Sequence, residues 1–341
     1  MRPHPPTADR ARPGQRTAGD RPGRLLIAAL ASLLGCVAVA ARPVLGEEPP
    51  ITALAFSPDG SAVVAASQRG LLVLDWPGLT ERATFETASP NPHALAFSPS
   101  GNRLAVGGGS PASEGTVEIR AWPGLESLLG ASCHDDSVLD LAWRDGRTIV
   151  AASLDRSIVL LDVDSGAVVC RLEGHSRGVS SLATLPDEGT LVSVGLDRSL
   201  RVWNLDSGGL IHSLDQHTGP VHSVEPRPGG VDPALVATAS DDRTDRFWQP
   251  SIGRMVRTCR LDSPALDLCW LPDGSRVAAC CVDGHVRLID PTTVEVISDI
   301  PALDGWAYAI AVHPTGDGLV VGGPDGRILR IDLRDQSLPP P

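Results

Sequence analysis

The sequence contains no lysine, and its 29 basic residues are all arginine. Because 41 acidic residues bring the formal net charge to −12, the chain lacks the basic excess with which proteins bind nucleic acid in general. Aromatic residues make up only 4% of the chain, against 35 glycines and 30 prolines. Few large side chains and many turn formers argue against a coiled coil, a helical bundle and a disordered chain. What remains is a turn-rich globular protein.

Spacings typical of metal sites are missing as well. His134, His175 and His217 recur one repeat apart, and that spacing indicates a repeated structural hydrogen bond rather than a set of metal ligands. The other histidines show no HxxxH spacing, and no glycine-rich loop leads into a helix where it could hold a phosphate. We therefore expect no metal ion and no cofactor.

The amino terminus predicts an export signal. Residues 1–24 are rich in Pro, Gly and Arg and predict a disordered basic region, and residues 25–41 carry no charge. This arrangement is typical of a signal peptide, and Ala40 lies in a run of small residues that suits a signal peptidase. The alternatives are an uncleaved membrane anchor, since residues 25–41 are just long enough to span a bilayer, and a lipoprotein whose Cys36 is lipidated. In each case the rest of the chain is expected outside the cytoplasm, with membrane contact only through this segment.

From Ile51 onward the chain repeats itself. Residues 54–60, LAFSPDG, return as residues 95–101, LAFSPSG, and five weaker copies follow at intervals of 41 to 46 residues. Each period holds four short apolar segments separated by Pro-Gly or Asp-centred turns, the pattern of a four-stranded unit. Seven such units predict an all-β fold over residues 51–338, a seven-bladed β-propeller of four-stranded antiparallel blades.

The fourth and fifth copies share a histidine, a hydroxyl side chain, an aspartate and a tryptophan at matching places: His175, Ser193, Asp197 and Trp203, and then His217, Thr238, Asp242 and Trp248. With these residues the chain resembles the Trp-Asp (WD) repeat family of β-propellers. In that family the four side chains form a row of hydrogen bonds from the indole through the hydroxyl and the histidine to the aspartate. The resemblance therefore implies a structural network in each of these two blades.

We expect the segment that precedes the first repeat to close the ring by adding a strand to the seventh blade. After Asp332 only nine residues remain, and they end in three prolines, so the seventh copy lacks a fourth strand of its own. The resemblance implies that residues 42–50, a linker in the sequence, supply this strand. We expect Val44 and Leu45 to pair with residues 327–331, at an edge where the flanking prolines are tolerated.

The resemblance implies a non-catalytic scaffold, so we expect a monomeric ring that binds a protein or peptide on one face. The loops expected on that face are residues 134–137, 176–178, 218–220 and 304–306. The candidate partner-binding residues in these loops are Asp136, Arg177, Asp304 and Trp306.

An exported propeller enzyme, lactonase-like or quinoprotein-like, is the alternative function. Such an enzyme would carry acids, His or Asn around a central channel. The sequence shows no recurrence of those residues at positions expected to line a channel, which favours the scaffold.

Three local features leave structural questions open. Glu225 and Asp245 replace apolar residues of the sister repeats, and we expect Arg227 or Arg246 to neutralise one of them, or the blade to form a polar binding surface. Residues 107–109, three glycines, predict a flexible loop. The cysteines after the leader lie mostly at apolar positions and are expected to be buried thiols, although export would permit disulfides: Cys133, Cys170, Cys259, Cys269, Cys280 and Cys281.

Overall fold

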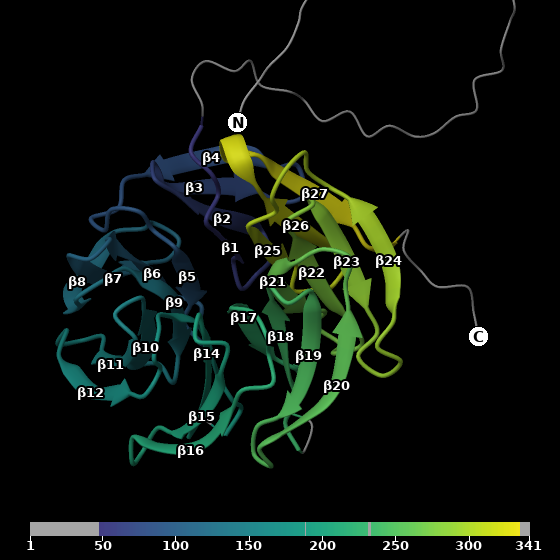
Figure 1. Cartoon of the computed structure of the whole chain (residues 1–341). Coiled ribbons are helices and arrows are strands. Elements are labelled where there is room, and N and C mark those ends of the chain that lie inside the picture. The colour runs from purple at the N-terminus through teal and green to yellow at the C-terminus, as the bar shows by residue number, and fades with distance from the viewer. Residues whose placement is uncertain (1–47, 188, 231–232, 335–341) are drawn as a thin grey trace, which may run out of the picture. The chain divides into compact units, whose positions relative to one another are not determined.

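The computed structural model describes residues 48–187, 189–230 and 233–334, which form seven antiparallel sheets arranged around an axis (Figure 1). Each sheet is made of consecutive strands, and the first strand of each sheet contacts the first strands of its two neighbours. Apart from one turn of 3-10 helix, η1 (Pro324–Gly326), the described residues contain only strands, turns and loops. The fold is the seven-bladed, all-β propeller that the repeat predicts.

The first strand of each blade lies innermost, and the second lies next to it. The first strands are β1 (Ala53–Phe56), β5 (Ala94–Phe97), β9 (Val138–Trp143), β13 (Val179–Thr184), β17 (Val221–Pro226), β21 (Ala265–Trp270) and β25 (Ala309–Val312). The second strands are β2 (Ala62–Ser67), β6 (Arg103–Ser110), β10 (Thr148–Ser153), β14 (Thr190–Gly195), β18 (Val236–Ser240), β22 (Val277–Cys281) and β26 (Gly318–Gly322).

The third strand follows, and the fourth strand forms the outer edge. The third strands are β3 (Gly70–Asp75), β7 (Glu114–Ala121), β11 (Ser157–Asp162), β15 (Leu200–Asn204), β19 (Thr244–Gln249), β23 (His285–Ile289) and β27 (Ile328–Asp332). The fourth strands are β4 (Thr80–Phe85), β8 (Ser127–His134), β12 (Val168–Glu173), β16 (Gly209–Leu214), β20 (Arg254–Arg260) and β24 (Val296–Pro301). In the seventh blade the described residues supply three strands.

Burial explains why the strands differ in sequence. The second strands, such as β10 (TIVAAS) and β22 (VAACC), are almost wholly buried because blades pack on both of their faces. They therefore read as continuous runs of small and β-branched apolar residues. The fourth strands, such as β12 (VVCRLE), are mostly exposed at the rim and mix apolar with charged residues.

The core is divided into seven apolar clusters, one between each pair of neighbouring blades. The cluster between the first and seventh blades has the fewest buried apolar residues, namely Val63, Leu74 and Val320. Each interface buries apolar side chains that a single blade would expose, at about 1.5–3 kcal/mol for a fully buried aliphatic side chain. A blade is therefore stable only within the ring.

Aromatic and polar contacts supplement the small cluster where the ring closes. The His313 imidazole stacks on the Trp76 indole, with ring centroids 5.2 Å apart and an interplanar angle of 17°, and His313 Nε2 lies 3.1 Å from the Gly60 carbonyl oxygen. The Ile51 N–H also donates to the Gly323 carbonyl oxygen, at 3.1 Å. These contacts join the first blade to the seventh.

The predictions for residues 1–24, 25–41 and 42–47 concern residues that lie outside the described part of the chain, and so does the expected pairing of Val44 and Leu45. The described neighbours of that segment do lie beside the seventh blade, since Glu48 packs against Gly326. In the described part of the chain, no helix is long and apolar enough to span a lipid bilayer.

The flexible loop predicted for residues 107–109 is wrong. The three glycines lie inside β6, which extends with β7 into a long hairpin. A Cβ atom on Gly108 would come within 2.6 Å of the Asn91 carbonyl oxygen and of Ser89 Oγ. Glycine is needed here because the segment that enters the second blade passes directly over the strand.

Candidate functional site

Four side chains of the fourth blade form one row of hydrogen bonds. The Trp203 Nε1–H donates to Ser193 Oγ at 2.8 Å, Ser193 Oγ lies 2.8 Å from His175 Nε2, and His175 Nδ1 lies 3.0 Å from Asp197 Oδ2. Because an indole N–H can only donate, the Ser193 hydroxyl accepts from it and donates its own proton to Nε2. His175 is thus assigned as neutral, with its proton on Nδ1 and donated to the carboxylate.

The fifth blade repeats this row with threonine in place of serine. The Trp248 Nε1–H donates to Thr238 Oγ1 at 2.9 Å, Thr238 Oγ1 lies 2.8 Å from His217 Nε2, and His217 Nδ1 lies 2.8 Å from Asp242 Oδ2. Burial lowers the pKa of His217, more than the neighbouring carboxylate raises it. Burial raises the pKa of Asp242, but hydrogen bonds from His217, the Thr244 hydroxyl and a backbone N–H outweigh burial and hold it well below its usual value.

The third blade keeps only half of the row. His134 Nδ1 lies 2.8 Å from Asp155 Oδ2, but Ala151 and Leu161 occupy the places of the hydroxyl and the indole. His134 Nε2 is consequently buried without a hydrogen-bond partner. Because the third blade keeps the imidazole and the carboxylate without the hydroxyl and the indole, the pair has a structural role that does not depend on the complete row.

That role is to hold the loop that enters each blade. The same carboxylate oxygen that binds the histidine also accepts the N–H of the next residue in the loop: Asp135 to Asp155 at 3.1 Å, Ser176 to Asp197 at 2.9 Å and Thr218 to Asp242 at 3.0 Å. The other carboxylate oxygen closes the turn before the third strand, as in the bond from the Ser157 N–H to Asp155 Oδ1 at 2.8 Å. One aspartate therefore fixes two neighbouring loops in each of the three blades.

These loops lie on one face of the ring. Because successive strands of a blade run in opposite directions, the segment entering a blade and the turn between its second and third strands emerge on the same face. We call this the entry face. The turns between first and second and between third and fourth strands lie on the opposite face. The loops predicted to bind a partner, residues 134–137, 176–178, 218–220 and 304–306, all precede a first strand and so belong to the entry face.

The candidate residues on the entry face differ in exposure. Trp306 is 51% exposed and the Asp304 side chain is fully exposed, with Arg327 3.7 Å away. Arg177 is exposed at the tip of its loop. Asp136 is half-buried, and its Oδ1 accepts the N–H groups of Ala112 and Ser137 at 2.9 and 2.8 Å. The structure thus leaves three of the candidates available to a partner and uses the fourth to join two loops.

Residues 174–178 read Gly-His-Ser-Arg-Gly, which is the Gly-x-Ser-x-Gly pattern of a nucleophile elbow. An elbow requires a sharp turn from a strand into a helix, with the serine raised above the sheet. Here the five residues form the loop between β12 and β13, and the Ser176 N–H is bound by Asp197. The only histidine of the pattern, His175, is already committed to Ser193 and Asp197. The pattern therefore does not form an acyl-transfer site in this fold.

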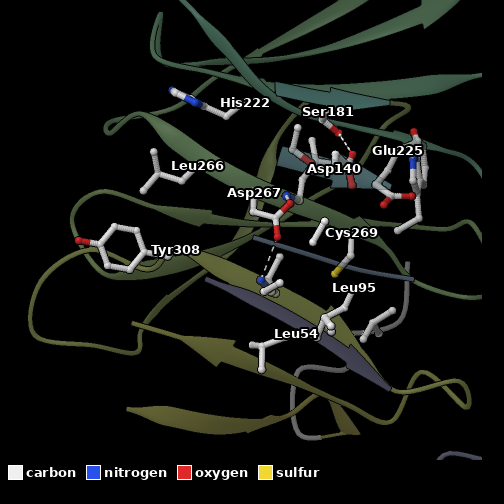
Figure 2. Close-up of a pocket in the computed structure, with 18 of the residues that line it drawn as sticks. Leu54, Leu95, Asp140, Ser181, His222, Glu225, Leu266, Asp267, Cys269 and Tyr308 are labelled. Carbon is white, nitrogen blue, oxygen red and sulfur yellow. Dashed lines mark hydrogen bonds between the residues drawn. The ribbon is translucent and has the colours of Figure 1, made fainter. Parts of the chain in front are cut away.

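A channel of about 540 Å³ runs along the axis and is lined by the first strands of all seven blades (Figure 2). At its entry-face mouth each blade places one residue of the same repeat position: Thr52, His93, Leu139, Ser180, His222, Leu266 and Tyr308. In the third to sixth blades this residue is the extra residue of a β-bulge, as Ser180 is between Val179 and Ser181. A bulge adds one residue without a cross-strand partner and redirects its side chain.

Three carboxyl groups face this channel: Asp140, Glu225 and Asp267 (Figure 2). Surrounding protein and the other two acids raise the pKa of Glu225 to about 8, although the residue is exposed to the channel. Burial raises the pKa of Asp140 and of Asp267 to about 6. Asp140 and Asp267 occupy the same repeat position, three residues before a tryptophan. The expectation that no acid recurs at channel positions is therefore wrong, and the recurrence was visible in VLDLAW and ALDLCW.

Both aspartates of the channel also join neighbouring blades. Asp140 Oδ2 accepts the Ser181 hydroxyl at 2.7 Å and the Leu182 N–H at 2.8 Å, and Asp267 Oδ2 accepts the Ile310 N–H at 3.1 Å. These bonds account for both aspartates as structural groups. Among the described residues, no group of three His, Cys, Asp or Glu side chains is arranged to hold a metal ion.

The expectation that Arg227 or Arg246 neutralises one of the two acids of blade five is also wrong; the alternative, a polar surface on this blade, fits Glu225, which lines the channel. Arg227 lies over the Trp270 ring, 5.7 Å from its centroid, and Arg246 binds the Gln216 carbonyl oxygen and Asp242. Both oxygens of Asp245 lack a hydrogen-bond partner in the described part of the chain. The six cysteines of the described residues are free thiols, and Cys170 and Cys269 are only half-buried.

Comparison with known protein families agrees with the propeller fold and with the hydrogen-bonded rows. The WD40 family model, described as WD domain, G-beta repeat, matches residues 43–74, 166–204, 208–249 and 253–290. The chain belongs to the WD-repeat family of β-propellers. The matched segments include the fourth and fifth blades of this WD-repeat protein, where the hydrogen-bonded rows are complete. The second blade, with no counterpart of the row, falls outside them.

Several curated proteins are similar to parts of this WD-repeat chain. It is 31% identical to a guanine nucleotide-binding protein subunit beta of Lymnaea stagnalis over 157 residues, 43% of each chain. It is 35% identical to the target of rapamycin complex subunit LST8 of Mus musculus over 113 residues, 32% of this chain and 34% of that protein. It is 36% identical to the chromatin assembly factor 1 subunit FAS2 homolog of Oryza sativa over 116 residues, 32% of this chain and 22% of that protein. In each case the match spans less than half the length of the relative.

Proposed function

We propose that this WD-repeat protein is a non-catalytic scaffold that binds a protein partner on its entry face. The observation that carries the proposal is the aspartate that fixes two loops in each of three neighbouring blades, because it presents those loops as one rigid surface. A preformed surface loses little conformational entropy on binding. The three relatives described above are each named as a subunit of a larger protein or complex, which supports a role in assembly.

Trp306 is the residue of this face best suited to anchor a partner. Its indole is half exposed beside Tyr308, with ring centroids 5.9 Å apart, and the side chain of Asp304 in the same loop is fully exposed. A large aromatic side chain held by a neighbouring ring gives binding energy at little entropic cost. Arg177 adds a long charged side chain on the fourth blade.

The test is affinity capture from the source cells with the wild-type protein and with the double variant Trp306→Ala, Arg177→Ala. Ile252→Ala is the matched control, because Ile252 is also 51% exposed but lies in the turn between β19 and β20, on the opposite face. The proposal predicts partners that the wild type and the control retain and the double variant loses. Equal capture by all three proteins would remove this face from consideration.

We also propose that residues 1–41 export the protein or tether it to the membrane. Support comes from the sequence alone: six arginines precede the uncharged residues 25–41. Fractionation of cells that express the chain with and without residues 1–41 tests this. The full chain is expected in the extracytoplasmic or membrane fraction and the shortened chain in the cytoplasm, and the same location for both would contradict the proposal.

A hydrolytic enzyme is the second candidate, and the channel carboxyl groups are the observation that favours it. Glu225 is exposed to the channel beside Asp140 and Asp267, and a pKa raised by surrounding protein and by these two acids is a property of a general acid at neutral pH. Metal analysis of the purified protein separates this candidate from the scaffold. Stoichiometric calcium or zinc would favour the enzyme, whereas protein that captures a partner without bound metal would favour the scaffold.

A further inference from the structure

Asp245 stands where the sister blades carry apolar residues. It lies in β19, at the place of Ile158, Leu200, Val286 and Ile328 in four other blades. Its side chain is completely buried. Ala239 and Cys259, its cross-strand neighbours, both belong to the apolar cluster between the fifth and sixth blades, so Asp245 faces that interface.

No group at the interface neutralises the Asp245 carboxyl. Neither of its oxygens has a hydrogen-bond partner among the described residues. The titratable and charged groups that face it are Asp242 from the turn before β19, Cys259 from β20, Cys281 from β22 and Arg287 from β23. Asp242 repels a second negative charge, and both thiols are uncharged because burial raises the pKa of each to about 12.

Arg287 is the cation of this set, and it is bound elsewhere. Its NH1 and NH2 groups donate to the two oxygens of Asp283 at 3.1 and 2.7 Å, and NH2 also lies 3.4 Å from Asp299 Oδ2. Both of these carboxylates lie toward the solvent, while the guanidinium itself is buried. A charged Asp245 would therefore have to compete with two existing partners for the same arginine.

We propose that the interface between the fifth and sixth blades is a pH-sensitive seam, closed while Asp245 is neutral and loosened when its carboxyl ionises. Burial without a partner is the physical cause, because a carboxylate needs hydrogen bonds or a counter-ion once water is excluded. The raised pKa of Asp245, about 8, agrees with this geometry. At mildly acidic pH the seam is tight, and toward alkaline pH it opens to give the carboxylate access to water.

The sign of the effect follows from proton linkage. Between the pKa of the open or unfolded state, near 3.8, and that of the closed state, near 8, the closed protein binds one more proton. Raising the pH through that window therefore favours opening, by up to about tenfold in the equilibrium constant per pH unit, and has no further effect above it. Below the window Asp245 is neutral in both states and the effect vanishes.

Urea unfolding from pH 5 to 9 tests the proposal with the wild type, Asp245→Asn and Asp245→Leu. The ratio of the wild-type unfolding constant to that of either variant is expected to rise at least tenfold from pH 5 to 8 and to level off above. Asp304→Asn is the matched control, since it removes a carboxyl group that is fully exposed. Its ratio is expected to stay constant. A constant ratio for the Asp245 variants would overturn the proposal.

A second measurement reports the seam itself. Alkylation of Cys259 and Cys281 by iodoacetamide, mapped by mass spectrometry, is expected to accelerate with pH more in the wild type than in Asp245→Asn, because opening exposes both thiols. Equal acceleration would contradict the seam. A third measurement needs no variant: the Asp245 carboxyl carbon, followed by NMR in the labelled wild type, is expected to titrate well above pH 6. A midpoint near 4 would overturn the proposal.

Discussion

At the scale of single residues, one hydroxyl group decides whether a blade completes its hydrogen-bonded row. Ser193 and Thr238 each connect an indole donor to an imidazole acceptor, and the third blade, with Ala151 at this place, leaves His134 Nε2 without a partner. The aspartate nevertheless holds its loop in all three blades. Loop positioning thus depends on the carboxylate, and stability depends on the whole row.

Ser193→Ala is expected to destabilise the protein by about 1–3 kcal/mol, because it leaves the Trp203 N–H and His175 Nε2 buried and unpaired. Ser193→Thr keeps the hydroxyl and reproduces the fifth blade, so it is expected to cost less than half as much. Urea unfolding at pH 7 measures both. Equal losses for alanine and threonine would show that the hydroxyl plays no part.

Asp242→Asn tests the charge of the carboxylate. The pKa of Asp242 is lower in the folded protein than its usual value, so its stabilisation is present above pH 4 and is lost as the pH falls toward the folded value. The variant is expected to be about 1–3 kcal/mol less stable than the wild type at pH 7, and this difference should shrink below pH 4. A difference that stays the same from pH 7 to pH 3 would contradict a role for the charge.

At the scale of elements, the sequence predicted the strands and turns correctly but placed the glycines of residues 107–109 in a loop instead of a strand. The PDG and Asp-centred turns marked the ends of the strands, because their chemistry is local. Residues 107–109 were mistaken for a loop, since a Cβ on Gly108 would meet residues 89–92, which pass over β6, and a Cβ on Gly107 would meet Val138 and Leu141 of the third blade, contacts that the local pattern does not reveal. The β-bulges at the channel mouth were not predicted either, because an extra residue in a strand leaves the apolar pattern of the sequence nearly unchanged.

The segment that precedes the first blade is expected to stabilise the closure of the ring. Glu48 packs against Gly326 of the seventh blade and forms an ion pair with Arg69 of the first blade at 2.5 Å. A chain that starts at residue 51 is expected to have a melting temperature roughly 3 °C or more below that of a chain that starts at residue 42, at 2–4 °C per kcal/mol for a domain of this size. Deletion of the six terminal residues 336–341 serves as the control. If both changes lowered the melting temperature equally, the closing role would be contradicted.

At the scale of the whole molecule, the ring is held by seven apolar interfaces of unequal size, and we propose that it binds its partner on the entry face. The number of blades, their strand order and the hydrogen-bonded rows of blades four and five were predictable, because each rests on a pattern that repeats in the sequence. Glu225 was singled out from the sequence, but Asp140 and Asp267 were missed although they repeat, since the groups that bind them belong to the next blade and are distant in the sequence. The sequence does not predict that Asp245 lacks a hydrogen-bond partner, because only the packing shows that Arg246 binds Asp242 and Arg287 binds Asp283.

Hydrogen–deuterium exchange of the protein with and without a captured partner tests the central claim most directly, namely that the entry face is the binding surface. The account predicts slower exchange on binding in residues 135–137, 176–178, 218–220 and 304–306, and unchanged exchange in the opposite turn at residues 250–253. Protection confined to the opposite turns or to the outer strands would contradict it.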